Sequence, residues 1–343
     1  MAELQLGELI GNKSIRMQLT IAHGAAKLHN RAMGHILFSG LAGCGKTTSA
    51  KALALLGESV FLEANPESLR SAEDLTLLFN KFPETGYDTT TGEKEGSVDP
   101  PIVFIDEAHR LTLKAQELLG IAMENFRHTY IVGKGRHKHI VTAWVPEFTL
   151  VIATTKEGDL SKPFRDRFMA NYVFGSYTYE ESIDILKLHA GKRAIPIDEK
   201  AVTAISRRGR GTPRTLVKFL ENMHDSMVYL GRKEITLDLV ESRFQLMGID
   251  PVGLTSEDIV ILRDLYFSEG PKGIDSLAVK TNLDPRTIME VNEPFLILLG
   301  FMERSKSGRI ITDDGERHLI NYGHVEPPTA SQAGSARILH RED

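Results

Sequence analysis

The chain has 343 residues, more than one hydrophobic core usually supports, so we expect two or three domains. Apolar residues make up 41% and charged residues 25%, and the lack of any long apolar run argues against a membrane span. A net charge of -5 excludes an overall basic field that would attract nucleic acid, and the single cysteine, Cys44, excludes an internal disulfide framework.

The chain begins with MAELQLGELIG, which contains neither the basic region nor the apolar core of a signal peptide. A cytoplasmic location is therefore the default expectation. An apolar run from Gly34 to Phe38 follows and predicts the first strand.

A glycine-rich loop comes directly after that strand, in 38-FSGLAGCGKTTSAKALA-54. A glycine, four residues and then Gly-Lys-Thr form the spacing of a phosphate-binding P-loop. Glycines let the backbone N–H groups wrap around phosphate, the helix that follows adds its positive dipole end, and a threonine hydroxyl can ligate magnesium. The predicted nucleotide-binding residues are Gly40, Gly43, Cys44, Gly45, Lys46, Thr47 and Thr48. The alternative is a glycine turn that happens to precede a helix.

Two further apolar strands end in polar residues. In 101-PIVFIDEAHRL-111, Asp106 would hold magnesium and Glu107 would orient or deprotonate an attacking water. The bland alternative is a solvated helix start, because acids favour the first turn. In 148-FTLVIATT-155, Thr154 and Thr155 would contact a γ-phosphate or the water, although this could also be an ordinary strand end. We therefore expect an α/β fold with a parallel sheet whose strands share one active edge.

The remaining segments predict the domain organisation. Helices are predicted by apolar spacing at 179–193, 198–209, 214–230, 236–247, 256–267, 274–281 and 285–300. The segment 301–315 predicts two strands around a Ser-Gly turn, and these last elements together predict a winged helix. The insert 83–101 has no periodicity and predicts a surface loop. The expected parts are an ATPase domain (1–176), a helical lid (177–250), a winged helix (251–324) and a disordered tail (325–343).

The chain resembles the RuvB-type Holliday-junction branch-migration motors, a bacterial branch of the AAA+ ATPases. The resemblance is carried by stretches that span nearly the whole chain, including 103-VFIDEAHRL-111, 163-PFRDRF-168, 211-GTPR-214, 293-EPFLILLGF-301 and 307-SGRIIT-312. It implies a hexameric ring that hydrolyses ATP with Mg²⁺ at subunit interfaces and moves duplex DNA at four-way junctions, in recombination and repair. It also implies a junction-binding partner that resembles RuvA.

The resemblance also implies roles for single residues. Lys46 and Thr47 would bind phosphate and magnesium, Asp106 the metal, Glu107 the water, and Thr155 would be the polar sensor. Arg167 would be the arginine finger that reaches a neighbouring subunit, Arg214 would let the lid sense nucleotide, and the adenine would rest near Leu9 and Ile10. The alternative for Arg165 and Arg167 is a surface ion pair with Asp166.

The chain departs from the family pattern in several places. The P-loop has Leu41-Ala42-Gly43-Cys44 where the family has two prolines, glycine and leucine, and the insert 83–101 is absent from typical members. The hairpin that meets the RuvA-type partner in the family includes Val132. Its tip carries Arg136, His137, Lys138 and His139 here instead of small residues. A metal site at this tip is the less favoured alternative to a solvated or DNA-facing turn, since no cysteine or nearby acid completes a ligand set.

Three cations surround the Ser307-Gly308 turn of the predicted wing: Arg304, Lys306 and Arg309. A tight turn that projects cations suits contact with the DNA backbone, and a solvated turn is the alternative. Two other functions stay open. One is a AAA+ switch of the initiator or clamp-loader kind, and the other is an adaptor that binds ATP without hydrolysing it.

Overall fold

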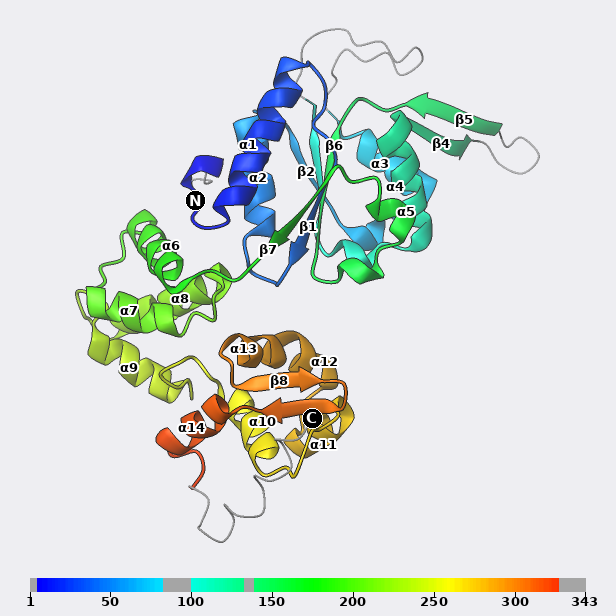
Figure 1. Cartoon of the computed structure of the whole chain (residues 1–343). Coiled ribbons are helices and arrows are strands. Elements are labelled where there is room, and N and C mark those ends of the chain that lie inside the picture. Colours follow the sequence, from blue (N-terminus) through cyan, green and yellow to red (C-terminus); the bar gives the residue numbers. More distant parts are fainter. Residues whose placement is uncertain (1–4, 83–99, 133–138, 327–343) are drawn as a thin grey trace. The chain divides into compact units, whose positions relative to one another are not determined.

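The computed structural model describes residues 5–82, 100–132 and 139–326. The chain divides into two compact units (Figure 1). The N-terminal unit contains residues 1–185 and 211–215, and the C-terminal unit contains residues 186–210 and 216–343.

A five-stranded parallel sheet is the centre of the N-terminal unit, with strand order β2-β3-β6-β1-β7 (Figure 1). The strands are β1 (Ile36–Gly40), β2 (Phe61–Ala64), β3 (Ile102–Ile105), β6 (Thr149–Thr154) and β7 (Ala170–Phe174). β3, β6 and β1 are consecutive in the sheet, with β6 in the middle. The carboxyl ends of the three predicted motif strands therefore meet at one edge. The prediction of an α/β fold with a parallel sheet is confirmed.

Successive side chains of a strand point to opposite faces of the sheet and so contribute to two separate cores. On β3, Val103 and Ile105 belong to one core, while Ile102 and Phe104 belong to the other. The second core includes residues of α1 and α2, and the first includes residues of α3 and α4. The helices of this unit are α1 (Lys13–Leu28), α2 (Lys46–Leu56), α3 (Ala72–Phe79), α4 (Leu113–Asn125) and α5 (Lys162–Arg165), with short 3-10 turns η1 (Leu6–Glu8), η2 (Pro66–Ser68), η3 (Ala108–Arg110) and η5 (Glu157–Asp159).

An antiparallel hairpin of β4 (Arg127–Val132) and β5 (His139–Trp144) extends this unit, with Val132 paired to His139. His128 fastens the hairpin to α3, because its Nε2 lies 2.7 Å from the carbonyl oxygen of Ala72. Of the expected partner-contacting residues, His139 is exposed, whereas Arg136, His137 and Lys138 lie outside the described residues. Most of the 83–101 insert and of the tail lies outside them too.

The C-terminal unit is mainly helical. Its helices are the end of α6 (Tyr179–Lys192), α7 (Glu199–Arg207), most of α8 (Pro213–Tyr229), α9 (Leu237–Leu246), α10 (Ser256–Tyr266), α11 (Ile274–Thr281), α12 (Pro285–Thr287), α13 (Glu293–Leu298) and α14 (Asp313–Asn321). β8 (Met302–Ser305) and β9 (Gly308–Ile311) form the wing. The predicted helix 285–300 is interrupted by five residues of π-helix directly before α13, whose Pro294 cannot donate a backbone hydrogen bond. α14 was not predicted from the sequence.

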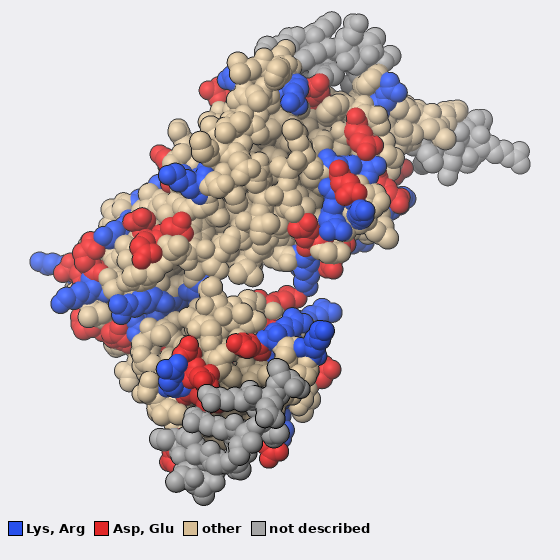
Figure 2. Space-filling model, viewed as in Figure 1, with Lys and Arg blue, Asp and Glu red and all other residues tan. Residues whose placement is uncertain are grey.

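Figure 2 shows Lys and Arg beside Asp and Glu in several clusters, while the middle of the visible face of the N-terminal unit carries few charged side chains. Within the described ranges, none of the helices combines the length and the apolar character that crossing a bilayer requires.

Candidate functional site

The P-loop joins β1 to α2, and its geometry accounts for the glycines. Gly40 has φ of 122°, and a Cβ at this position would lie 2.1 Å from the carbonyl oxygen of Phe174. Gly45 has φ of 88° and directly precedes α2. A side chain at either position would therefore distort the loop, and its backbone could not close around the start of the helix.

Lys46 is buried at the centre of this loop, with 6% of its surface exposed. Its ammonium group donates hydrogen bonds to the carbonyl oxygens of Gly40 at 2.9 Å and Leu41 at 2.7 Å. Burial lowers the pKa of Lys46, and the nearby Asp106 and Glu107 carboxylates oppose this shift. The amine is thus held at the loop's centre by backbone carbonyls and by the acids at the end of β3.

Two oxygen ligands suited to magnesium lie side by side. The Thr47 hydroxyl donates a hydrogen bond to Asp106 Oδ2 at 3.1 Å, and the second oxygen of Asp106 accepts the backbone N–H of Glu107 at 2.9 Å. A hydroxyl and an ionised carboxylate are hard oxygen donors of the kind that Mg²⁺ prefers beside a phosphate chain. The residues present therefore fit the cation that the sequence predicted here.

Glu107 is positioned by a histidine that the sequence reasoning missed. Its backbone has φ of 51°, and its Oε2 lies 3.3 Å from Nε2 of His109. The other ring nitrogen of His109 lies 3.1 Å from the hydroxyl of Thr154, so the imidazole links Glu107 to the end of β6. The signal was present in the sequence, because a histidine two residues beyond Glu107 lies in the same motif.

The two threonines that end β6 differ in exposure. Thr154 is fully buried, and its hydroxyl contacts His109 and accepts the backbone N–H of Lys156 at 3.0 Å. The expectation that Thr154 contacts phosphate or water is therefore wrong, because the side chain is occupied in the core. Thr155 is exposed at the strand end, and its role as a polar sensor stays a prediction.

One wall of the loop is formed by residues from both ends of this unit. The Tyr177 hydroxyl donates to the carbonyl oxygen of Cys44 at 3.2 Å and accepts from Asn12 at 3.2 Å. Leu9 packs against the core that contains Cys44, and Ile10 is half-buried beside it in the chain. Burial raises the pKa of the Cys44 thiol, so this cysteine is a packing residue.

Arg214 lies against the P-loop. A Cβ at Gly43 would be 3.1 Å from the Cβ of Arg214, and the guanidinium charge also lowers the pKa of Lys46. The side chain is exposed. The role as a nucleotide sensor that the resemblance implies for Arg214 stays a prediction.

Arg167 lies apart from this group of residues. Its Nε is 3.0 Å from Glu124 on α4, and it donates to the carbonyl oxygen of Pro163. The pair with Asp166 that was the alternative interpretation is not the one formed, since Arg165 approaches Glu157 and Arg167 approaches Glu124. Within this chain, the structure therefore brings together Lys46, Thr47, Asp106, Glu107 and Arg214, and not Arg167.

The wing differs from the prediction at Arg309. Arg309 is 6% exposed, and its Nη2 and Nε donate to Glu293 Oε2 at 2.8 and 3.1 Å. Its backbone also forms an isolated antiparallel bridge with Lys272, outside the two strands of the wing. The prediction that Arg309 projects toward DNA is therefore wrong, because its guanidinium forms a buried ion pair with Glu293. Arg304 and Lys306 are exposed, and for them DNA contact stays a prediction.

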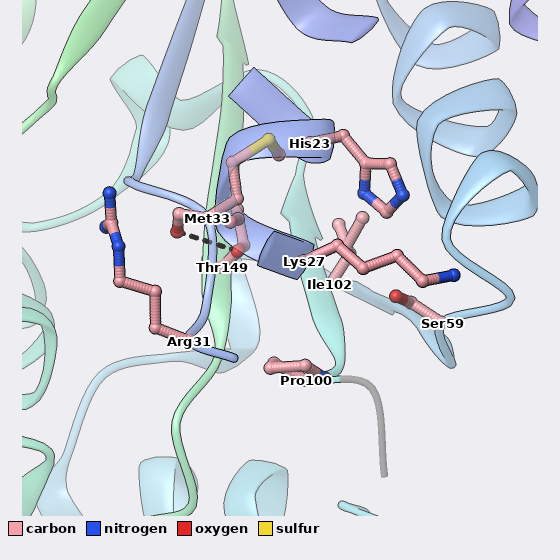
Figure 3. Close-up of a pocket in the computed structure, with 9 residues that line it drawn as sticks. His23, Lys27, Arg31, Met33, Ser59, Pro100, Ile102 and Thr149 are labelled. Atoms are coloured by element: carbon pink, nitrogen blue, oxygen red, sulfur yellow. Dashed lines mark hydrogen bonds between the residues drawn. The ribbon is translucent and has the colours of Figure 1, made fainter. Parts of the chain in front are cut away.

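A small cavity of about 40 Å³ lies at the opposite edge of the sheet (Figure 3). Its lining includes Met33, the first residues of β3 and β6, and three basic side chains from α1 and the turn after it: His23, Lys27 and Arg31. Ligands of parallel sheets bind beyond the carboxyl ends of the strands, and this cavity is at the amino ends. It is therefore not the nucleotide site.

Three family models match the chain in succession. The RuvB P-loop domain of Holliday junction DNA helicases matches residues 2–173, the RuvB AAA lid domain matches 177–250, and the RuvB C-terminal winged helix domain matches 251–320.

Similar proteins agree with these matches. Holliday junction branch migration complex subunits RuvB from Wolbachia sp. subsp. Brugia malayi and from Fervidobacterium nodosum are each 34% identical over 92% of this chain, which spans 92% and 87% of those proteins. The Thermotoga maritima RuvB Holliday junction branch migration motor superposes with a TM-score of 0.76 at 30% identity, over 94% of this chain and 98% of that one. A mutant of the same protein gives 0.78 at 29% identity, over 94% and 99%. With a P-loop, a paired acid motif and a winged helix in this order, the chain belongs to the RuvB family of Holliday junction DNA helicases.

Proposed function

We propose that this protein is an ATP-driven motor that moves the branch point of Holliday junctions along duplex DNA. The observation that carries the proposal is the joining of Lys46, Thr47, Asp106 and Glu107 in one site. It occurs in a chain whose three parts match the RuvB models in order. A protein that only bound ATP would not need an acid placed to activate water beside the magnesium ligands.

Each residue of the site has a distinct task in hydrolysis. Lys46 and the N–H groups at the start of α2 bind the outer phosphates, and Thr47 and Asp106 would hold Mg²⁺, which neutralises charge on the phosphate oxygens. Glu107 orients the attacking water and accepts its proton, so that ATP and water give ADP and phosphate. His109 holds Glu107 in place through the contact at 3.3 Å.

The assembly is proposed from the family. Arg167 lies outside its own subunit's P-loop group, which supports a finger that acts on the site of a neighbour in a hexameric ring. Four-way junctions and duplex DNA are the proposed substrates, a RuvA-like junction-binding protein is the proposed partner, and the β4–β5 hairpin is its proposed contact. The proposed compartment is the cytoplasm.

Branch migration of a labelled four-way junction tests this function. Wild-type protein with ATP, Mg²⁺ and a RuvA-type protein should dissociate the junction into duplexes by branch migration. DNA-stimulated ATP turnover should continue for as long as ATP lasts. The Glu107→Gln variant should bind the junction without moving it. A single round of ATP binding with no sustained turnover would instead favour the switch function, and binding without hydrolysis would favour the adaptor.

A further inference from the structure

Three side chains that could bind a metal ion lie together in the C-terminal unit. Asp250 follows α9, His318 lies on α14 and His324 follows α14. One ligand atom from each lies within 4.8 Å of the other two. We propose that these residues form a binding site for a late first-row divalent cation, with Zn²⁺ as the ion to test first.

The Asp250 carboxylate is already oriented as a ligand. Its Oδ1 accepts the backbone N–H groups of Val252 at 2.9 Å and Leu254 at 2.8 Å. Its Oδ2 accepts a hydrogen bond from Nε2 of His318 at 2.7 Å. Ligands of a tetrahedral zinc ion are about 3.3 Å apart, given bonds of about 2.0 Å, so these two atoms must move apart by about 0.6 Å to bind the ion. The cation takes the place of the proton in this hydrogen bond, and that proton leaves to solvent.

His324 supplies the observation that a hydrogen-bonded pair alone does not explain. Its Nε2 atom is buried, and it lacks a hydrogen-bond partner within the part of the chain that the structure describes. A buried ring nitrogen without a partner calls for a water or an ion. The backbone N–H of His324 donates to Leu319 at 2.8 Å, which holds the residue at the end of α14.

The His318 ring is also held in one orientation. It packs between the rings of Phe301 and Tyr322, with centroid separations of 4.7 and 4.6 Å. Two imidazoles and one carboxylate are a donor set that favours zinc, cobalt, nickel or copper over magnesium and calcium. With three protein ligands, the fourth position belongs to water.

Charge sets the expected strength of this site. Asp250 supplies one negative charge, while the positive charge of Arg263 acts on His324. That arginine opposes a second cation, so we expect weaker binding than at a site with four protein ligands. A bound ion would connect the segment after α9 to the end of α14, and so fasten the linker to the winged helix.

Cobalt titration of the full chain, free of nucleotide and magnesium, tests the proposal. Tetrahedral Co²⁺ absorbs visible light far more strongly than six-coordinate Co²⁺, so binding at the P-loop would not produce the same band. Wild-type protein should show the band with one equivalent of Co²⁺, and Zn²⁺ should abolish it. The variant His324→Gln keeps the Asp250–His318 hydrogen bond and should bind Co²⁺ about 100-fold more weakly, or worse, because even indirect partners of a metal contribute 10–100-fold.

Matched controls separate the site from other histidines. His29 is exposed just after α1, and His29→Gln should titrate as wild type does. The thermal midpoint should rise with added Zn²⁺ in wild type and in His29→Gln, and not in His324→Gln. His324→Cys replaces one ligand with another and should restore the band. Equal Co²⁺ titrations for wild type and His324→Gln, or the absence of a tetrahedral band in wild type, would overturn the site.

Discussion

Glu107 lies between two fixed neighbours, Asp106 and His109, and this position is the basis of the first prediction. Glu107→Gln keeps the shape of the side chain and removes its basicity, so ATP hydrolysis should fall by about 10²–10⁴ while ATP affinity stays the same. Lys46→Ala should weaken the affinity itself. Phosphate release and nucleotide titration measure the two effects separately, and hydrolysis by Glu107→Gln at the wild-type rate would contradict the role assigned to this acid.

His35 gives a prediction about pH. Its ring is buried, with Nε2 3.1 Å from the carbonyl oxygen of Met123 and Nδ1 accepting the N–H of Leu150 at 2.9 Å. Burial lowers the pKa of His35 below its ordinary value of 6.5, and the hydrogen bond to Met123 only partly offsets this. The folded protein therefore binds fewer protons than the unfolded chain below about pH 6.5.

It follows that His35 contributes its full stability above pH 6.5 and loses it as the pH falls toward the lowered pKa. The free energy of unfolding should decrease with a slope of up to about 1.4 kcal/mol per pH unit from this proton. Urea denaturation between pH 8 and pH 5 measures the slope. His35→Gln retains a donor and an acceptor but cannot titrate, so the variant should show a smaller slope; an identical slope would exclude His35 as a source.

The wing places three cations that look alike in the sequence in different environments: Arg309 is buried, whereas Arg304 and Lys306 are exposed. Arg309→Ala leaves the buried Glu293 carboxylate without its main partner and should lower the free energy of unfolding by about 3–5 kcal/mol. Lys306→Ala, at the exposed turn, should change it by less than about 0.5 kcal/mol. Urea denaturation of the two variants tests this, and similar stability losses would show that the ion pair is not the cause.

DNA binding, unlike stability, should depend on the exposed Lys306. Lys306→Ala should weaken binding about equally on unrelated duplexes and lower the slope of log affinity against log salt by about one. A salt titration with wild type and variant provides the measurement. An unchanged slope would remove Lys306 from the DNA contact.

These elements also show what local sequence can predict. The strands around the P-loop and the acid motif were predictable because apolar runs and motif residues are adjacent in the chain. The burial of Arg309 was not, because its partner Glu293 lies 16 residues earlier and only the fold brings them together. The Asp250–His318 contact spans 68 residues and includes α14, an element that the sequence analysis did not predict.

For the whole molecule, the ring is the property to test. Arg167→Ala should be inactive by itself, since an arginine finger contributes roughly 10³-fold or more in rate. Mixed with Glu107→Gln subunits, it should recover part of its turnover, because some interfaces then join an intact finger to an intact site. Turnover across mixing ratios is the measurement, with ring formation verified. No recovery at any ratio would mean that Arg167 acts within its own subunit.

Residues 211–215 belong to the N-terminal unit, although the residues on either side of them belong to the C-terminal unit. Arg210, directly before this segment, pairs with Asp258 at the start of α10 and donates to the carbonyl oxygen of Gly253. Arg214, within it, lies against the P-loop. Four residues of extended chain span at most about 14 Å, and peptide planes hardly stretch. If nucleotide displaces Arg214, as proposed, this short stretch of backbone would carry the movement to Arg210 with little loss, and the ion pair of Arg210 with Asp258 would pass it to the winged helix.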